Sequence, residues 1–196
     1  MLSVRDLSAR GIVTASFDLP PGACFALRGP SGSGKTLLLR AIADLDPAEG
    51  EVLLDGRPRA LMDGPDWRRR VVYLAAEPGW WAERVDQHFP DWPSALPMAE
   101  ALGLSPDMGR RPVAELSTGQ RQRLVLVRAL ARGPQVLLLD EPTSALDEDS
   151  RDRLESLIKA KQAQGLAVLW VSHDPAQAAR VASHSLVLEG GRVRAG

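Results

Sequence analysis

The sequence is poor in several features that mark particular classes of protein. It contains one cysteine among 196 residues, Cys24, so an internal disulfide is excluded and a reducing interior is permitted. No apolar run approaches the roughly 18 residues that a membrane-spanning helix needs, and the first residues lack the layout of a signal peptide. The formal net charge of −1 gives no attraction to nucleic acid or anionic lipid. We therefore expect no nucleic-acid partner, and any membrane-spanning part would belong to another chain.

The most informative stretch that is present is rich in glycine and serine. Its eight residues are Gly29, Pro30, Ser31, Gly32, Ser33, Gly34, Lys35 and Thr36. Two glycines separated by four residues and followed by Lys-Thr are typical of a phosphate-binding loop. Glycines let backbone N–H groups curl around phosphate oxygens, the lysine ammonium binds the outer phosphates, and the threonine hydroxyl binds Mg²⁺. A helix that begins near Gly34 would add the positive end of its dipole.

The residues on either side of this loop support that interpretation. A glycine- and serine-rich turn could match the pattern by chance, but Ala23–Arg28 predicts a buried strand and Leu37–Ala43 predicts an apolar helix. A strand before the loop and a helix after it are the context that phosphate binding requires. The sequence therefore predicts a nucleoside triphosphate site between these two elements.

The remaining patterns predict an α/β fold of the P-loop NTPase class. Leu2–Leu7 and Ile12–Leu19 alternate apolar and polar residues, as in a half-buried antiparallel pair. After the loop, the strand patterns Val71–Ala75, Val136–Leu139 and Ala167–Val171 alternate with helical segments. This alternation is typical of a mainly parallel sheet flanked by helices, with ligands at the carboxyl ends of its strands.

Two helix starts follow these strands. Asp147 is expected to cap a helix whose first turn is acidic. Asp174 and Pro175, with Gln177 three residues after the aspartate, predict a second well-formed start.

Residues 76–132 differ from the rest of the chain. Prolines and tryptophans interrupt the strand patterns there, whereas Met98–Leu104 and Leu116–Arg132 predict helices. We expect a single domain in which residues 1–75 and 133–196 form the nucleotide-binding core and 76–132 form a small helical subdomain.

A second nucleotide-binding element follows the strand Val136–Leu139. Its end carries two carboxylates, and we expect Asp140 to hold Mg²⁺ together with Thr36 while Glu141 polarises the attacking water. Two acidic residues after a core strand can also cap a helix, but the phosphate loop favours the metal role.

The segment Leu116–Gln120 distinguishes between the classes of P-loop protein. Ser117 followed by Gln120 predicts a capping box at a helix start. With Arg121-Gln122-Arg123 after it, the segment also resembles the signature motif of ATP-binding cassette (ABC) ATPases, with Thr118 in place of the family's glycine.

This resemblance covers nearly the whole chain, with the motifs in the family's order. Gly29–Thr36 resembles the phosphate loop, Val136–Glu141 the metal-binding strand with its catalytic glutamate, and Ser144–Asp147 the dimer-contacting loop. His173 resembles the histidine that contacts the γ-phosphate. The resemblance implies that Lys35, with Glu141 and His173, is catalytic.

The resemblance also implies how the protein is assembled. ABC ATPases form homodimers that close over two Mg-ATP, so Ser117, Gly119 and Gln120 of one subunit would complete the ATP site of the other. The chain would then be the ATP-hydrolysing subunit of a transporter, bound to a membrane permease at the cytoplasmic face of the bacterial inner membrane. Similarity to iron-export ATP-binding proteins suggests iron as the cargo.

Two other functions are compatible with a phosphate loop. A soluble non-transport ABC ATPase of DNA repair, chromosome handling or translation is the alternative, but such relatives carry long coiled coils or two cassettes, and this chain has neither. A P-loop kinase of small molecules would explain neither Leu116–Gln120 nor His173.

Besides Thr118, two places depart from the family pattern, and a pair of tryptophans follows one of them. Ala76 stands where the family has a glutamine that touches Mg²⁺, so we expect weakened coupling there, with Glu77 as a substitute carboxylate. No aromatic residue lies near the first hairpin turn, where Arg10 is expected either to stack on adenine or to be a solvated turn residue. Trp80 and Trp81 end the segment where a permease would dock, and they predict either an interface anchor or burial in the helical part.

Overall fold

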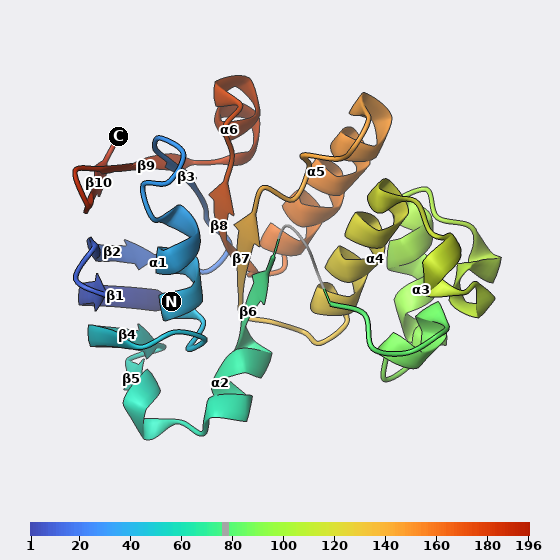
Figure 1. Ribbon diagram of the computed structural model, residues 1–196, viewed down its shortest axis with the longest axis horizontal. Coiled ribbons are helices and arrows are strands. Elements are labelled where there is room, and N and C mark those ends of the chain that lie inside the picture. The colour runs from blue at the N-terminus through green and yellow to red at the C-terminus, as the bar shows by residue number, and fades with distance from the viewer. Residues whose placement is uncertain (76–78) are drawn as a thin grey trace.

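A mixed sheet runs through the computed structural model, which describes residues 1–75 and 79–196 (Figure 1). Ten strands of this part of the chain follow the order β5-β4-β1-β2-β10-β9-β3-β8-β7-β6. Their bounds are β1 Leu2–Ala9, β2 Val13–Leu19, β3 Cys24–Arg28, β4 Ala48–Leu54, β5 Arg57–Pro58, β6 Val71–Leu74, β7 Val136–Asp140, β8 Ala167–Val171, β9 His184–Glu189 and β10 Arg192–Ala195.

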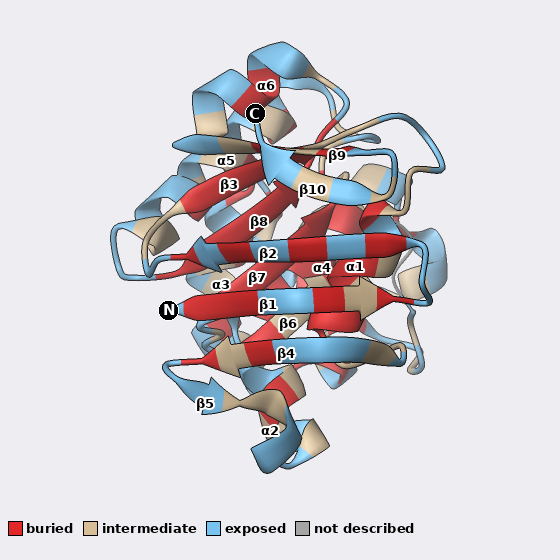
Figure 2. Ribbon diagram, turned by 90° about the vertical axis from the view of Figure 1, so that its left-hand side faces the viewer, coloured by how far each residue is buried: buried red, intermediate tan, exposed pale blue. Residues whose placement is uncertain are grey.

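The N-terminal strands form the antiparallel part of the sheet. β1 pairs with β2 and with β4, and Leu2 lies opposite both Leu19 and Leu54. Along β2, every second residue is buried, so one face packs inward and the other meets solvent (Figure 2). The predicted half-buried antiparallel pair is confirmed, and its turn begins with Arg10 at φ 52°.

The strand that leads into the phosphate loop and three later strands form the central parallel part of the sheet. β3, β8, β7 and β6 are parallel neighbours, and β7 and β8 are buried on both faces. Alternate residues of β7 enter different cores: Leu138 joins the core with β1, β2 and α1, whereas Leu137 and Leu139 join the core with α4 and α5. The carboxyl ends of these strands therefore meet at one edge, as the sequence predicted.

Helices cover both faces of the parallel strands. α1 (Lys35–Ile42) lies between them and the antiparallel strands, while α5 (Glu148–Gln162) lies on the opposite face (Figure 1). α2 (Gly64–Arg70) precedes β6, and α6 (Pro175–Val181) precedes β9. The α/β class with an antiparallel N-terminal part is confirmed.

Residues 79–132 form a helical lobe beyond α5, on the right of Figure 1. It contains α3 (Trp92–Ala101), α4 (Thr118–Leu130) and short 3₁₀ turns at Val85–His88, Pro106–Arg110 and Val113–Glu115. The helix predicted at Met98–Leu104 begins at Trp92 and ends at Ala101. The earlier start includes Pro93, because a proline in the first turn lacks only an N–H that the helix does not use. Division of the domain at residues 76 and 132 remains a prediction, and no helix of the described residues has the length and apolar character to cross a membrane.

Candidate nucleotide site

The phosphate loop connects β3 to α1 and curls around its own lysine. Gly34 has φ 103°, and a Cβ there would lie 2.4 Å from Cγ2 of Val13, so both conformation and space require glycine. Lys35 Nζ donates hydrogen bonds to the carbonyl oxygens of Gly29 and Pro30, each at 2.9 Å. The lysine is only 7% exposed. Its ammonium is thus held inside the loop that the sequence assigned to phosphate.

The polar groups of this loop fit a bound phosphate. Ser33 Oγ is buried and has no hydrogen-bond partner among the described residues. Among the described residues, no side chain caps the start of α1, where Gly34 is the N-cap, so the first N–H groups of the helix have no side-chain acceptor there. An anion placed there would satisfy these donors and meet the positive end of the helix dipole.

The residues predicted to bind magnesium lie together. Thr36 Oγ1 donates to Asp140 Oδ2 at 2.7 Å, and the hydroxyl of Tyr73 donates to the same oxygen at 3.0 Å. Burial, together with the negative charge of Asp140, raises the pKa of Tyr73. Because Mg²⁺ is bound through one or two protein oxygens plus phosphate and water, Thr36 and Asp140 fit that ion.

Tyr73 was not predicted as a site residue. It lies on β6 beside β7, opposite Leu138. The sequence feature that could have identified Tyr73 was its hydroxyl group, which lies within an otherwise apolar strand beside the metal-binding strand.

The two groups expected to act on the γ-phosphate are in contact. Glu141 and His173 follow the ends of β7 and β8, and Glu141 Oε1 lies 2.8 Å from His173 Nε2. Glu141 has φ 52°, a strained backbone conformation for a residue with a side chain. Its N–H donates to the carbonyl of Val171 at 3.2 Å, and its carbonyl accepts from Gln122 Nε2 at 3.3 Å.

One cleft of about 490 Å³ collects most of the predicted residues. Its described lining residues are Arg10, Ser31, Gly32, Gly34, Lys35, Thr36, Leu37, Arg40, Asp46, Asp140, Glu141 and His173. The guanidinium of Arg40 binds both carboxylate oxygens of Asp46, at 2.7 and 3.0 Å, and thereby lowers the pKa of Asp46. Arg10 lies 3.8 Å from the same carboxylate, at the mouth of the cleft. Sequence analysis missed Arg40 and Asp46, which belong to no motif.

The signature segment forms the predicted helix cap. Gln120 N donates to Ser117 Oγ at 3.2 Å, and Ser117 N donates to the Gln120 side chain at 2.9 Å, so the capping box is confirmed. Ser117 and Thr118 are exposed, and a Cβ on Gly119 would lie 3.4 Å from the carbonyl oxygen of Ala145. None of the described residues that line the cleft comes from this segment. The structure therefore separates it from the phosphate loop of the same chain.

Comparison with known protein families is consistent with a nucleotide cleft and a separate signature segment. A family model described as ABC transporter matches residues 12–144, more than half of the chain. The chain belongs to the ABC transporter family. Its class within that family is the ABC ATPases, so the resemblance and the family's P-loop fold are confirmed.

Several curated proteins are similar in sequence to this ABC protein over most of its chain. Protein STAR1 of Oryza sativa subsp. japonica is 39% identical over 90% of this chain and 54% of the relative. ABC transporter I family member 17 of Arabidopsis thaliana is 36% identical over 95% and 76%. The probable iron export ATP-binding protein FetA of Escherichia coli K12 is 35% identical over 81% and 76%. The chain spans 54% to 76% of the length of these relatives.

Solved structures share the architecture of the whole chain. A structure described as the ATP binding subunit of an ABC transporter has a TM-score of 0.90 and 26% identity, and covers 100% of this chain and 89% of that one. The ATP-binding cassette MJ0796, solved as a dimer with ADP and Pi, has a TM-score of 0.87 and 24% identity, with coverage of 100% and 98%. The second likeness supports the fold alone.

Proposed function

We propose that the chain hydrolyses ATP as one half of a homodimer that drives a separate membrane permease. The observation that carries this proposal is the division of the motifs between two places. Lys35, Thr36, Asp140, Glu141 and His173 line one cleft, whereas the signature segment Ser117–Gln120 lies outside it on an exposed helix start. A second copy that placed its signature segment over the cleft would complete the site.

The cleft supplies the groups that ATP hydrolysis requires. Thr36 and Asp140 would hold Mg²⁺, which neutralises charge on the phosphates when it is bound. Lys35 would exchange the carbonyl oxygens of Gly29 and Pro30 for phosphate oxygens of the nucleotide.

The reacting end of the nucleotide would meet the carboxyl ends of β7 and β8. Glu141 would orient water toward the γ-phosphoryl group, and the His173 ring that now contacts its carboxylate would bind that phosphoryl group. The partner subunit's Ser117 and the partner subunit's Gly119 would add donors from the other side, with Gln120 holding the serine in place.

The substitution Glu141→Gln tests this proposal. It keeps the shape of the side chain and removes the negative charge, so we expect turnover to fall at least about 100-fold while ATP binding persists. The ATP-bound dimer should then accumulate, and light scattering in Mg-ATP should report a mass doubled from that of the nucleotide-free chain. Glu189→Gln, at the exposed end of β9, is the control. A Glu141→Gln variant that stays monomeric in saturating Mg-ATP would contradict the two-copy site.

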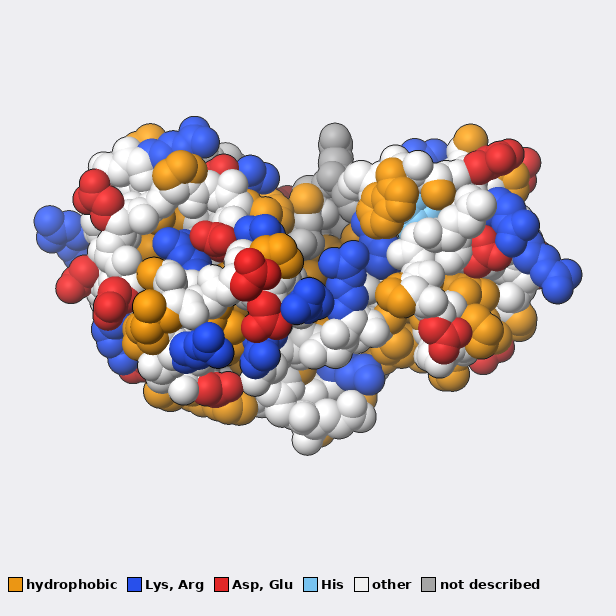
Figure 3. Space-filling model, turned by 90° about the horizontal axis from the view of Figure 1, so that it is seen from below, with side chains coloured by type: hydrophobic (Ala, Val, Ile, Leu, Met, Phe, Trp, Pro, Cys, Tyr) orange, Lys and Arg blue, Asp and Glu red, His pale blue; other side chains and the backbone are white. Residues whose placement is uncertain are grey.

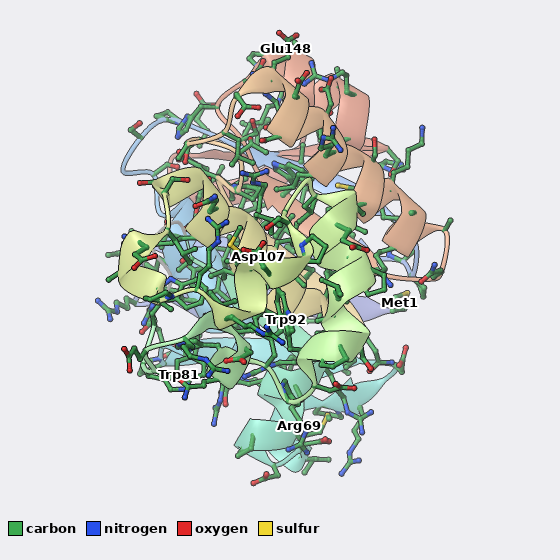
Figure 4. All side chains as sticks on the ribbon, turned by 90° about the vertical axis from the view of Figure 1, so that its right-hand side faces the viewer. Met1, Arg69, Trp81, Trp92, Asp107 and Glu148 are labelled. Carbon is green, nitrogen blue, oxygen red and sulfur yellow. The ribbon has the colours of Figure 1, made fainter. Side chains whose placement is uncertain are left out.

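The permease would dock on the helical lobe near Trp81, at the end of the segment Ala76–Trp81. Of this segment, Ala76, Glu77 and Pro78 lie outside the described residues. The Trp81 side chain is 65% exposed, and Figure 4 shows it at the edge of the lobe. The Arg128 guanidinium lies 4.7 Å from the ring of Trp81 and 5.0 Å from that of Trp80. Trp80 packs against the buried core of the lobe, so burial suits Trp80, whereas an interface anchor suits Trp81.

The contacts of Trp81 would make it a preorganised anchor. Its ring meets the ring of His88 edge-on, with centroids 4.5 Å apart, and Arg128, which lies over the Trp81 ring, donates a hydrogen bond to the carbonyl of Gly79 at 3.1 Å. A large side chain that is already fixed loses little conformational freedom when a partner covers it. Association with a permease would hold the protein at the cytoplasmic face of the membrane.

The permease, more than this chain, would determine which cargo is transported. Among the relatives, FetA is named for iron export, two ModC proteins for molybdenum import, and three SsuB proteins for import of aliphatic sulfonates, all at 35% to 37% identity. Iron export is thus one of three cargo classes with nearly equal support. Charged side chains of both signs are interspersed on the face shown in Figure 3, which favours a protein partner over nucleic acid. Purification of the tagged chain distinguishes a transporter subunit from a DNA-handling ATPase. A transporter subunit should co-purify with a multi-span membrane protein, and a DNA-handling ATPase with DNA.

A further inference from the structure

The side chain of Gln177 lies at the centre of a buried polar network behind the cleft. It belongs to the first turn of α6 and is 2% exposed. Its amide nitrogen donates to Glu155 Oε1 and to Thr143 Oγ1, both at 2.9 Å. Its amide oxygen accepts from Ser172 Oγ at 2.8 Å and lies 3.2 Å from Thr143 Oγ1. Both amide donors and the amide acceptor are thus engaged, by side chains of three different segments.

The predicted helix start at Asp174 and Pro175 is confirmed, but Gln177 takes no part in its cap. Asp174 caps α6 by accepting from the N–H of Ala176 at 2.9 Å, and Gln177 makes none of the described hydrogen bonds back to the cap. The glutamine instead points into the protein. Its role is therefore to be sought in the residues that it joins.

One of its partners fixes the backbone around His173. Ser172 is buried, and its hydroxyl accepts from the N–H of Asp174 at 3.0 Å while donating to the Gln177 amide. The residues before and after His173 are therefore linked to the same hydroxyl group. A change in the position of the Gln177 amide would move the histidine with this turn.

The other partner belongs to the segment of Glu141. Thr143 follows Glu141 by two residues, and it contacts Gln177 through its hydroxyl group. One amide group therefore connects the segment that carries the glutamate to the segment that carries the histidine. The 2.8 Å contact between Glu141 Oε1 and His173 Nε2 lies between these two segments.

The outer end of the network fixes which way the amide points. The carboxylate of Glu155 can only accept hydrogen bonds when ionised, so it must face the NH₂ group of Gln177. Arg180 binds both oxygens of Glu155, at 3.0 and 3.2 Å, and thereby holds this carboxylate in place. The amide oxygen is then left for Ser172.

We propose that Gln177 is a positioning residue that keeps Glu141 and His173 in register for hydrolysis. This inference rests on the proposed function, in which these two side chains act on ATP. Gln177 does not line the cleft among the described residues, so it acts only through Thr143 and Ser172. Removal of its amide group should misplace the two acting side chains and leave the phosphate loop intact.

Swapping the side chains of Gln177 and Glu155 by substitution gives a selective test. Gln177→Glu places a second carboxylate against Glu155 and removes both donors, so we expect kcat to fall by about 10- to 100-fold because the reacting groups shift. KM for ATP should stay within about twofold, since the binding interactions of the nucleotide are unchanged. Adding Glu155→Gln restores a donor facing the new carboxylate, to which Ser172 and Thr143 can still donate. The double variant should regain kcat to within about threefold of the starting protein.

Hydrogen exchange of the complete chain gives a readout that needs no turnover. In Gln177→Glu, the amides of Glu141, Thr143, Ser144 and residues 172–174 should exchange about tenfold faster, whereas those of Gly29 and residues 31–36 should not change. Gln162→Ala, which removes a weaker amide contact to the carbonyl of Gly22, is the matched control for both measurements. Unchanged exchange in both segments, or no rescue of kcat by Glu155→Gln, would overturn the inference. If Glu141→Gln also leaves turnover intact, the proposed function fails independently of Gln177.

Discussion

The two surfaces that would enclose ATP differ in how far each is organised within one chain. On the phosphate-loop side, the functional groups are already paired: Lys35 with two loop carbonyls, Thr36 with Asp140, and Glu141 with His173. On the signature side, the hydroxyl group of the exposed Ser117 has one hydrogen-bond partner among the described residues, the backbone N–H of Gln120.

The difference indicates what each side needs from the nucleotide. Pairing within the cleft holds charged groups in place before the ligand arrives, and ATP must replace these contacts when it binds. At the exposed helix start, ATP has no such contacts to displace. This surface can therefore add its hydrogen-bond donors late, when a second copy approaches. Nucleotide binding should therefore depend on the first surface, and closure of the dimer on the second.

The largest effect should come from Lys35→Ala. It removes the buried ammonium and the charge-assisted hydrogen bonds to phosphate, which we expect to cost about 2–3 kcal/mol, or roughly 30- to 150-fold in Kd for ATP. Equilibrium binding of a fluorescent ATP analogue measures this change. Lys159→Ala removes an exposed lysine of α5 as the control. Binding within about twofold of the starting protein would show that the cleft does not hold the triphosphate.

A smaller and qualitatively different effect is expected at Ser117. Ser117→Ala removes the N-cap and should cost about 1 kcal/mol of unfolding free energy. Ser117→Asp keeps a capping oxygen, and therefore stability, but places a negative charge where the partner's ATP would approach.

Both Ser117 variants should lose turnover, by about tenfold or more, with ATP affinity of the single chain unchanged. Thermal unfolding, equilibrium binding and steady-state hydrolysis measure the three quantities. Normal hydrolysis by Ser117→Asp would mean that the signature segment does not face a nucleotide.

The starts of α4 and α6 show how far sequence reasoning could reach. Both combine a capping residue with a glutamine three positions later, and the spacing correctly predicted the capping box of Ser117 and Gln120. At α6 the same spacing predicted only the helix start. Gln177 is buried beside Thr143 and Ser172, and these tertiary partners outcompete the local cap. Residue spacing predicts local structure, whereas the hydrogen-bond partners of a buried polar side chain depend on segments distant in sequence.

Most of the cleft was nevertheless predictable, because it lies at chain positions fixed by local patterns. A strand end followed by two carboxylates indicated Asp140 and Glu141, the glycine pattern indicated the phosphate loop, and the family resemblance indicated His173. Arg40 and Asp46 could not be found in this way, since their pairing depends on how α1 packs beside the loop that follows it. The prediction placed the start of α3 too late, because the prolines of residues 76–132 indicate interruptions, whereas Pro93 lies in the first turn of this helix.

An intermediate effect, confined to the assembled protein, is expected at Trp81. Trp81→Ala should weaken association with the co-purifying permease by about 30-fold, as for an interface hot spot, without changing ATP hydrolysis by the isolated chain. Trp92→Ala is an informative contrast, because Trp92 packs within the lobe against Phe89, and its loss should lower the melting temperature instead (Figure 4). A stability loss for Trp81→Ala as large as that for Trp92→Ala would assign Trp81 to the core.

The smallest effect should come from Arg10, at the rim of the organised side. Its guanidinium side chain is 60% exposed, so stacking on adenine would contribute about 0.5–1 kcal/mol, or two- to fivefold in Kd. Because a planar cation stacks on any purine, Arg10→Ala should weaken ATP and GTP binding equally. Arg10→Trp should restore the stack, whereas Arg5→Ala, which removes an arginine paired with Asp18 away from the cleft, should change neither affinity. If Arg10→Ala leaves both nucleotides unaffected, Arg10 is a solvated turn residue, and the purine is recognised by the phosphate-loop side without a stacking group at the hairpin.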